Sequence, residues 1–529
     1  MLIGLFTTCR RTLAKMTGFN HHMKREHIRL CKQHVYLAAR TFQNASFETI
    51  YSLSSGHGKC GVAVVRVSGH RIKDTIRRLT NLEEIPSPRK ASYQRFYDPV
   101  SREQIDKGLL LWFPGPNSFT GEDVCEFQVH GGPAIINALY TALDRLPGLR
   151  PAEAGEFTKR AFQNGKLDLT EVEGLSDLIH AETEAQRKQA LRQMQGELGT
   201  LYNDWRQRLI KCAASVEAYI DFSEDDNIED GVLEDASKMV KSLMIEIEEH
   251  LSDNRRGERL RSGVHVTIAG PPNAGKSSLL NAICQRPAAI VSPIAGTTRD
   301  VVETAVNISG YPVLLSDTAG LRETKDVIEQ EGVQRALQRA QQADITILVL
   351  DVMDVNTGTV MEHIMETLGR LRQGQREMIS ETQNSSMNNV LSTESDWTKD
   401  TIVVLNKIDS LADKEQEGIL WDETAKMRNL CLISCLNGDN FDIFLELLQD
   451  RVKAMCGNPS IGNPSLTQTR HRNHLNKCLE ALESFHEHQD LVIVAEHLRI
   501  AMLQIGKITG KVGAEEILDV LFQDFCIGK

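Results

Sequence analysis

Short apolar runs separated by glycine and proline dominate the chain between residues 48 and 164. Three of them, Cys60–Val67, Gly108–Phe113 and Val124–Val129, have the length and the apolar content of strands. Runs of this kind bounded by turn residues predict a small mixed domain of the α+β class over residues 48–164.

Helical periodicity flanks a stretch with a different pattern. Residues 165–260 are rich in Glu, Ala, Leu, Gln and Arg, and helical spacing returns over residues 458–529. Residues 261–457 instead alternate apolar strands with helices, which predicts a mainly parallel, doubly wound sheet. We therefore expect one α-helical domain with an α/β domain inserted into it. The strands expected in the inserted domain are Val264–Ala269, Pro312–Ser316, Ile345–Asp351, Ile402–Leu405 and Cys431–Ser434.

Two other features of the pattern limit the architecture. Residues 372–400 are polar and poor in aliphatic side chains, which predicts a disordered surface insertion. No uncharged apolar run approaches the ~20 residues that span a bilayer. The most apolar stretch, Ile345–Val352, contains Asp351. We expect no membrane span.

Composition is that of an ordinary globular protein, since 41% of the 529 residues are hydrophobic and 25% are charged. Residues 1–47 carry eight Lys or Arg and a single acid, Glu26, whereas the rest of the chain carries 52 bases and 71 acids. A basic, acid-poor leader predicts a mitochondrial transit peptide, with a disordered cytosolic tail as the alternative. The acidic remainder argues against a large nucleic-acid-binding surface and leaves room only for local basic patches.

Eleven cysteines are scattered along the chain without a CxxC pair. Their odd number and wide spacing predict free thiols in a reducing compartment. Cys431 and Cys435 lack a second ligand pair at the spacing of a zinc site, so no structural metal is expected there.

A phosphate-binding loop is predicted between the strand Val264–Ala269 and a helix that begins near Lys276. Residues 270–277, GPPNAGKS, match the pattern GxxxxGK followed by Ser or Thr. In this context backbone amides hold phosphates, Lys276 neutralises the β and γ oxygens, and Ser277 offers a hydroxyl to Mg²⁺. A chance Gly-rich turn is the alternative, which the flanking strand and helix disfavour. The residues expected around the phosphates are Asn273, Ala274, Gly275, Lys276, Ser277 and Ser278.

The other elements of a GTPase follow in order. The DTAG segment at 317–320 follows a strand and places a carboxylate near the Mg²⁺ shell. The NKID segment at 406–409 contains Asp409, which can accept hydrogen bonds from guanine N1–H and the 2-amino group, a donor pair that adenine lacks. The residues concerned, with Ser434 in the last loop at the base, are Asp317, Thr318, Ala319, Gly320, Asn406, Lys407, Asp409 and Ser434.

The segment GTTRD at 296–300 lies between these motifs, and Thr298 is expected to give Mg²⁺ its second hydroxyl and to sense the γ-phosphate. Leu321 stands where a Ras-like GTPase has the Gln that orients water, and no arginine finger can be identified. A finger contributes on the order of 10³–10⁵ in rate, equal to ~4–7 kcal/mol. Another group must therefore supply that charge.

The segments GPPNAGKSS, GTTRD, DTAGLRET and NKID, with the terminal CIGK, resemble the MnmE (TrmE) family of tRNA-modification GTPases in its mitochondrial form. Residues 114–132 (PGPNSFTGEDVCEFQVHGG) and 155–169 (GEFTKRAFQNGKLDL) are similar to segments of that family that generic GTPases lack. The resemblance covers residues 48–529.

The resemblance implies a function as well as a fold. It implies a homodimer in the mitochondrial matrix that works with the FAD protein MnmG and contacts tRNA mainly through that complex. The product is an aminomethyl-type group on C5 of the wobble uridine, with taurine used in animal mitochondria. The one-carbon source is a 5-formyl or methylene derivative of tetrahydrofolate. The implied domains are a tetrahydrofolate-binding domain at 48–164, a helical domain at 165–260 and 458–529, and a G domain at 261–457.

Matching by motif also implies residue roles. Glu329 matches the family's catalytic Glu, which orients water indirectly and acts beside Lys276 and Thr298. The residues that would hold K⁺ in place of the missing finger are Asn273, Ser292, Ile294 and Thr297. The positions that match the folate contacts are Arg66, Glu126, Lys166 and Lys529, with Cys526 near the one-carbon unit.

Each of these roles has a plainer alternative. Glu329 fits a solvated helix face, and Glu126 and Lys166 fit surface ions. The sequence also departs from bacterial members at Pro271, where they often have Arg, and at residues 54–61 (SSGHGKCG). The alternative function is a regulatory GTPase switch whose helical arms bind an effector without chemistry; the folate-domain motifs oppose it.

Overall fold

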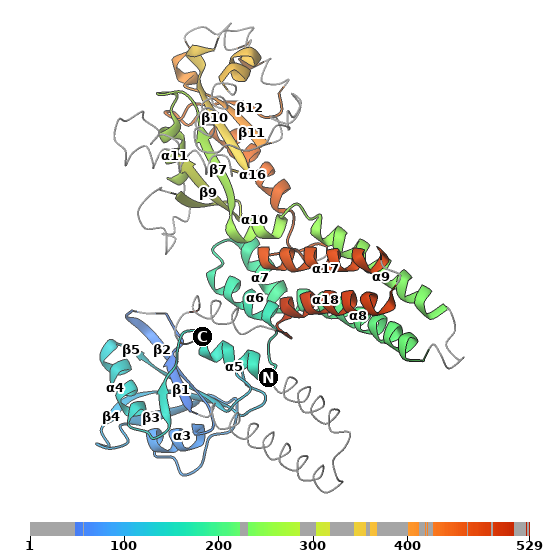
Figure 1. The fold of residues 1–529 in the computed structure, drawn as a ribbon. Helices are drawn as coiled ribbons and strands as arrows, with labels where there is room; N and C mark the ends of the chain where they lie inside the picture. Colours follow the sequence, from blue (N-terminus) through green and yellow to red (C-terminus); the bar gives the residue numbers. More distant parts are fainter. Residues whose placement is uncertain are drawn as a thin grey trace, which may run out of the picture. The chain divides into compact units, whose positions relative to one another are not determined.

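The computed structural model forms two compact units, one of residues 1–168 with 515–529 and the other of residues 169–514 (Figure 1). The leader 1–47 and the predicted insertion at 372–400, apart from Asp400, lie outside the described residues. The structure describes residues 48–56, 58–222, 231–285, 303–317, 343–355, 360–367, 400–411, 418, 420–421, 427–462, 464–487, 490–512, 525 and 528.

The first unit is built on a six-stranded sheet of order β3-β4-β5-β2-β1-β6. Ala63, Val65 and Val67 alternate along β2 and all face the core, as expected for a strand with one buried face. The predicted α+β domain is therefore observed, with three further strands that no long apolar run announces. The elements are β1 Thr49–Leu53, β2 Cys60–Ser68, α3 Ile72–Thr80, β3 Ser92–Tyr97, β4 Gln104–Phe113, β5 Val124–Gly131, α4 Pro133–Asp144, β6 Leu149–Pro151 and α5 Glu156–Gln163.

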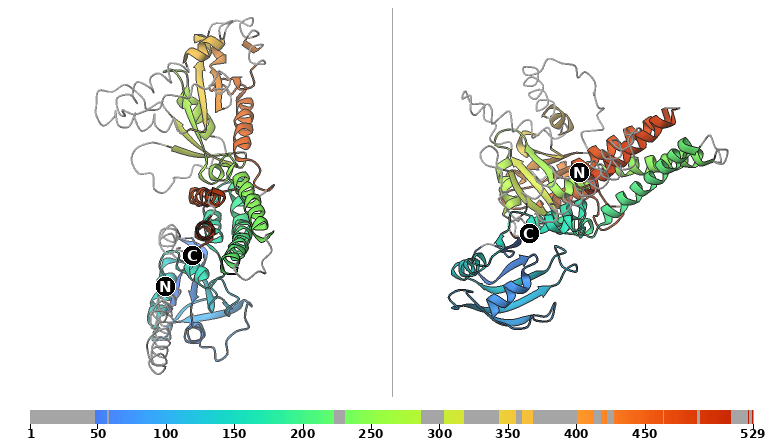
Figure 2. Two further views of the ribbon diagram at one scale, coloured as in Figure 1. Left: turned by 45° about the vertical axis from the view of Figure 1, so that its right-hand side comes forward. Right: turned by 60° about the horizontal axis from the view of Figure 1, so that its bottom comes forward.

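Helices from both ends of the second unit share one core. Four of them, α8, α9, α17 and α18, lie side by side (Figures 1 and 2). Buried residues recur every three or four positions, as in Tyr202, Trp205, Leu209 and Cys212, which is the stripe of a helix packed on one side. The helices are α6 Leu169–His180, α7 Glu184–Met194, α8 Glu197–Phe222, α9 Gly231–Leu251, α10 Arg256–Ser262, α17 Thr469–Glu487 and α18 Leu491–Thr509.

The inserted part contains a second six-stranded sheet of order β12-β11-β10-β7-β9-β8. All neighbouring strands are parallel except β8 and β9, so the predicted doubly wound, mainly parallel sheet is confirmed. The edge strand β8 was not predicted. The elements are β7 Val264–Ala269, α11 Lys276–Cys284, β8 Glu303–Ile308, β9 Tyr311–Asp317, β10 Ile345–Asp351, β11 Thr401–Asn406, β12 Leu430–Leu432 and α16 Phe441–Cys456.

Within the described ranges, no helix is both long and apolar enough to cross a membrane. Eight cysteines in these ranges are free thiols, and these ranges hold no cluster of His, Cys, Asp and Glu that could bind a metal ion.

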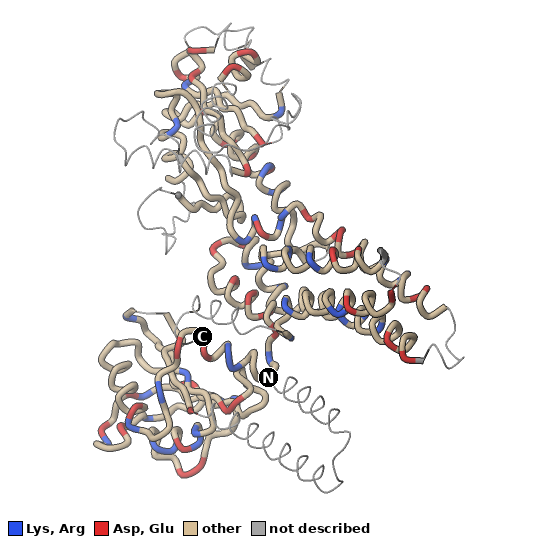
Figure 3. The backbone as a smooth tube through the Cα atoms, in the orientation of Figure 1, with Lys and Arg blue, Asp and Glu red and all other residues tan. Residues whose placement is uncertain are grey.

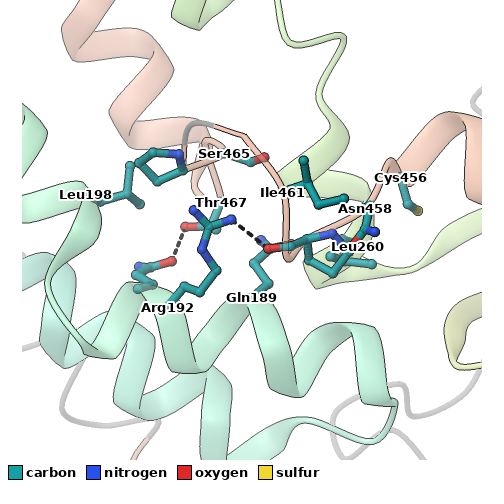
Figure 4. A pocket seen from close by; sticks show the side chains of 12 residues that line it. Gln189, Arg192, Leu198, Leu260, Cys456, Asn458, Ile461, Ser465 and Thr467 are labelled. Atoms are coloured by element: carbon teal, nitrogen blue, oxygen red, sulfur yellow. Dashed lines mark hydrogen bonds between the residues drawn. The ribbon is translucent and has the colours of Figure 1, made fainter.

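The linker between α16 and α17 returns the chain from the inserted domain, and side chains of α7 hold this linker in place. Arg192 donates from Nη1 to the carbonyl of Pro459 (2.7 Å) and from Nη2 to that of Gly462 (2.9 Å). Thr467 Oγ1 donates to Gln193 Oε1 at 2.8 Å, and both side chains are buried. Figure 4 shows Arg192 and Thr467 beside a small pocket between α7 and the linker. Side chains from before the insertion thus fix the path of the chain after it.

A buried ionic cluster also connects a helix from before the insertion, α6, to a helix from after it, α17. Glu173 of α6 accepts from Arg470 Nε at 2.6 Å and from His471 Nε2 at 2.9 Å, both in α17. Arg470 also donates to the carbonyls of Lys507 and Ile508 near the end of α18. Burial would raise the pKa of Glu173, but the charged and hydrogen-bonding partners outweigh it and lower the pKa to about 2.

We predict that Glu173→Gln lowers the free energy of unfolding by about 3 kcal/mol, because it leaves the buried Arg470 without its counter-charge. The pKa of Glu173 is lowered from its ordinary 4.5, so its contribution is complete above about pH 5 and is lost as the pH falls toward 2. Urea denaturation of both proteins between pH 7 and about pH 3 measures the difference, which should shrink as the pH falls.

The matched control is Glu217→Gln, which breaks an exposed ion pair with Arg499 at 2.8 Å and should cost less than about 0.5 kcal/mol. Equal losses in the two variants would contradict a special role for the buried cluster.

Candidate nucleotide-binding site

The predicted phosphate-binding loop lies between the end of β7 and the start of α11. Gly270 and Gly275 have φ values of 148° and 101°. A Cβ on Gly270 would lie 2.1 Å from the carbonyl oxygen of Val349, and one on Gly275 would lie 2.1 Å from Asn406 Nδ2. Both positions therefore exclude a side chain, and the loop packs directly against the neighbouring strands β10 and β11.

The loop places a cation where phosphates would bind. Lys276 Nζ donates to the carbonyls of Gly270 (2.9 Å) and Pro271 (2.8 Å), so its ammonium lies across the loop. Ser277 and Ser278 are exposed in the first turn of α11, and Ala274 is buried. Backbone amides at a helix start, a lysine and hydroxyls fit a phosphate chain and Mg²⁺.

One buried amide joins this loop to the loop expected at the base. Asn406 ends β11, donates from Nδ2 to the carbonyl of Ala274 (2.9 Å) and accepts at Oδ1 from the backbone N–H of Cys435 (3.1 Å). Next to it, Lys407 adopts a positive φ of 69° and pairs with Asp351 at 2.6 Å.

The sequence did not identify Asp351 as a residue of this site. It ends the parallel strand β10, beside β7 and β11. Its place after a buried strand was the only available signal, because it belongs to no motif.

Two residues expected to contact the base, Asp409 and Ser434, lie together. Ser434 is buried, and its Oγ donates to Asp409 Oδ1 at 2.5 Å while accepting from the backbone N–H of Asn437 at 3.1 Å. Asp409 itself is exposed, so its oriented carboxylate can accept from a base. Burial and the nearby Asp409 raise the pKa of Cys435 to about 11, which keeps this thiol uncharged beside the carboxylate.

Several predicted site residues are not described. Asp317 ends β9 opposite Ile268, but the role expected of its carboxylate remains a prediction. The residues that lie outside the described ranges are Ser292, Ile294, Thr297, Thr298, Thr318, Ala319, Gly320, Glu329, Cys526 and Lys529.

A second polar cluster lies in the N-terminal unit, on the face of its sheet. Arg66 of β2 and Glu126 of β5 are directly opposite in register and form an ion pair at 3.1 Å. The Arg66 guanidinium lies 5.4 Å from the ring centre of Phe119 and 5.8 Å from that of Phe157. The side chains of Arg66 and Glu126 are only 21% and 18% exposed, so this pair is more enclosed than a solvated surface pair. Lys166, by contrast, is exposed in the turn after α5.

The end of the chain reaches the same unit. Ser54 Oγ, just after β1, donates to the carbonyl of Gly528 at 2.8 Å. A Cβ on Gly528, whose φ is 106°, would lie 2.0 Å from the carbonyl oxygen of Leu53, and Phe525 is buried. The described residues of the tail thus pack tightly on the N-terminal unit.

Comparison with known proteins finds a matching family for the N-terminal part of the chain and another for the rest. The family described as GTP-binding protein TrmE N-terminus matches residues 49–166, and the MnmE helical domain family matches residues 169–526. The chain belongs to the MnmE family. The resemblance inferred from the motifs is confirmed, and membership implies that the chain uses a nucleotide and Mg²⁺.

The MnmE relatives match almost the whole chain. A zebrafish (Danio rerio) protein named 5-taurinomethyluridine-tRNA synthase subunit GTPB3, mitochondrial, is 56% identical over 91% of this chain and 93% of its own. The human (Homo sapiens) protein of the same name is 50% identical over the same shares. The tRNA modification GTPase MnmE of Parvibaculum lavamentivorans is 45% identical over 91% of this chain and all of its own.

We predict that Asp409→Asn shifts preference from GTP toward xanthosine triphosphate, because xanthine presents an acceptor where guanine presents its 2-amino donor. The contact is charge-assisted and bidentate, so the loss in GTP affinity corresponds to ~2–4 kcal/mol. Competition binding with both nucleotides measures it. Unchanged GTP affinity would show that Asp409 does not contact the base.

Proposed function

We propose that this chain hydrolyses GTP and, with an MnmG-type FAD protein, installs a taurinomethyl group on C5 of the wobble uridine of mitochondrial tRNA. The observation that carries the proposal is the joining of the phosphate loop to the guanine loop through Asn406, in a chain that also holds the enclosed Arg66–Glu126 pair. The names of the zebrafish and human relatives specify 5-taurinomethyluridine in tRNA and the mitochondrion.

In the nucleotide site, Lys276 binds the β and γ oxygens, and Ser277, Thr298 and the Asp317 carboxylate serve the Mg²⁺ shell. Glu329 orients the attacking water. Leu321 cannot orient water as a Gln does, and the sequence identifies no arginine finger, so a K⁺ ion held beside the phosphates would supply the missing charge. The proposed K⁺ ligands are Asn273, Ser292, Ile294 and Thr297.

In the N-terminal unit, Arg66, Glu126, Lys166 and Lys529 bind a 5-formyl or methylene derivative of tetrahydrofolate. The groups present suit a flat, polar heterocycle: Arg66 donates, Glu126 accepts, and the half-buried ring of Phe119 provides an apolar wall. The contact between Ser54 and Gly528 supports a role for the tail at this unit.

The proposed assembly is a homodimer that contacts tRNA mainly through its MnmG-type partner. The proposed domains are a transit peptide at 1–47, a folate-binding domain at 48–164, a helical domain at 165–260 and 458–529, and a G domain at 261–457. A purely regulatory GTPase switch is the alternative. The enclosed Arg66–Glu126 pair and the docked tail favour the modification enzyme, because a switch needs neither.

Rescue of cells that lack this protein tests the proposal, with mass spectrometry of the wobble uridines as the readout. We expect the full chain to restore taurinomethyluridine. Deletion of residues 526–529 should leave GTP turnover largely intact and abolish the modification, because the tail acts at the N-terminal unit. Lys276→Ala should abolish both activities.

Normal modification by the truncated chain would reject the role of the tail. No modification by the full chain together with its partner would reject the proposed function.

We also predict that GTP turnover is at least about tenfold faster in K⁺ than in Na⁺ at matched ionic strength, because a bound cation replaces a charge-stabilising donor near the phosphates. Steady-state phosphate release in the two salts measures the ratio. Equal rates would leave the missing charge to another group and would contradict the proposed K⁺ site.

A further inference from the structure

An open pocket with a cavity volume of about 630 Å³ lies where the loop between α9 and α10 meets α16. Arginines from the segment before the inserted domain and from α16 within it line the pocket, and Figure 3 shows blue segments around α10 and along α16. The residues that line the pocket are Asn254, Arg255, Arg256, Arg259, Asp400, Arg451, Ala454 and Met455.

The nearby carboxylates are largely used by other contacts. Arg259 forms an ion pair with Asp344, with Nε 2.7 Å from Oδ1. Asp253 and Glu258 are held by Arg472, at 2.8 and 3.2 Å. Cationic charge is therefore left over in the pocket, although the chain as a whole has a net charge of −12.

Two arginines carry most of this excess. The side chain of Arg256 is exposed and makes no ion pair or hydrogen bond to the residues that the structure describes. Arg255 is also exposed and approaches Glu258 only to 3.6 Å. Arg255 and Arg256 therefore leave positive charge beside Asp400, the one carboxylate among the described residues that line the pocket, and such a set favours an anion.

The loop that presents these arginines is held rigidly. Asn254 and Arg255 have φ values of 53° and 57°, an unfavourable conformation for residues with side chains. The loop is retained by Arg259 Nη1, which donates to the carbonyl of Asn254 at 3.0 Å, and by Arg472 Nη1, which donates to that of Leu251 at 2.7 Å. The backbone that carries Arg255 and Arg256 is thus held in place, and binding need not order the loop.

We propose that this pocket binds phosphate groups of an RNA backbone, so that the chain itself holds part of the tRNA. The inference rests on the proposed function, which makes tRNA the substrate. Guanidinium groups on separate elements match successive phosphates of a strand, whereas a single phosphate needs only one or two of them. RNA in this pocket touches the chain both before β7 and in α16, that is, both just before the inserted domain and within it.

Fluorescence anisotropy of the full-length protein with a labelled mitochondrial tRNA transcript tests the inference over a range of KCl concentrations. We expect the double variant Arg255→Ala, Arg256→Ala to bind about tenfold more weakly and to reduce the salt slope by about two, since each phosphate contact contributes about one. Arg256→Lys should keep most of the affinity. The matched control Arg499→Ala also removes an exposed arginine, one paired with Glu217 and Glu496, and should bind as the wild type does.

Equal affinity and salt slope in the double variant and the wild type would overturn the inference, as would the absence of RNA binding by the wild type. Inorganic phosphate that displaces RNA better than chloride at equal ionic strength would assign the pocket to small anions and also overturn it. GTP turnover and uridine modification are measured with the same proteins. If both are normal while the double variant binds RNA normally, the inference fails and the proposed function stands.

Discussion

The buried contact of Glu173 with Arg470 and His471 is the constraint on which the rest of the molecule depends. An α/β domain can be inserted into a helical domain only if the chain leaves and returns at nearly the same place. The cluster enforces this because Glu173 and His471 are inaccessible to water, so an unpaired charge there costs several kcal/mol. Burial lowers the pKa of His471, so the histidine stays neutral at neutral pH and donates its Nε2–H to the carboxylate. The linker held by Arg192 then sets the direction of return.

Inside the inserted domain, Asn406 has the corresponding role at smaller scale. Its two amide atoms are committed to the phosphate loop and to the loop at the base, so neither loop can move without breaking a buried hydrogen bond. The close approach of Gly275 to the same amide explains why that position has no side chain. Nucleotide recognition therefore depends on a connection between loops as well as on the contacts that each loop makes.

Much of the architecture follows from patterns that are local in sequence. The strands β7, β10 and β11 were predictable because both of their faces are buried, and buried parallel strands are continuous apolar runs. The strand β8 was missed because an antiparallel edge strand such as ETAVNI needs only alternate apolar residues. Features that depend on distant partners left no local signal: Glu173 looks like a solvated helix charge until Arg470, 297 residues later, is placed beside it. The basic pocket was hidden for the same reason, since Arg255, Arg256 and Arg259 precede the insertion and Arg451 lies far along the chain in α16.

The contact of Gly528 with Leu53 and Ser54 has a consequence for how the protein is made. The N-terminal unit contains its own sheet and core and leaves the ribosome early, but Ser54 finds its acceptor in a residue that is synthesised 474 positions later. A chain that stops before Gly528 therefore lacks this acceptor, however much of its length has folded. In this protein the N-terminal unit makes all of its described contacts only after translation has passed through the helical and inserted domains.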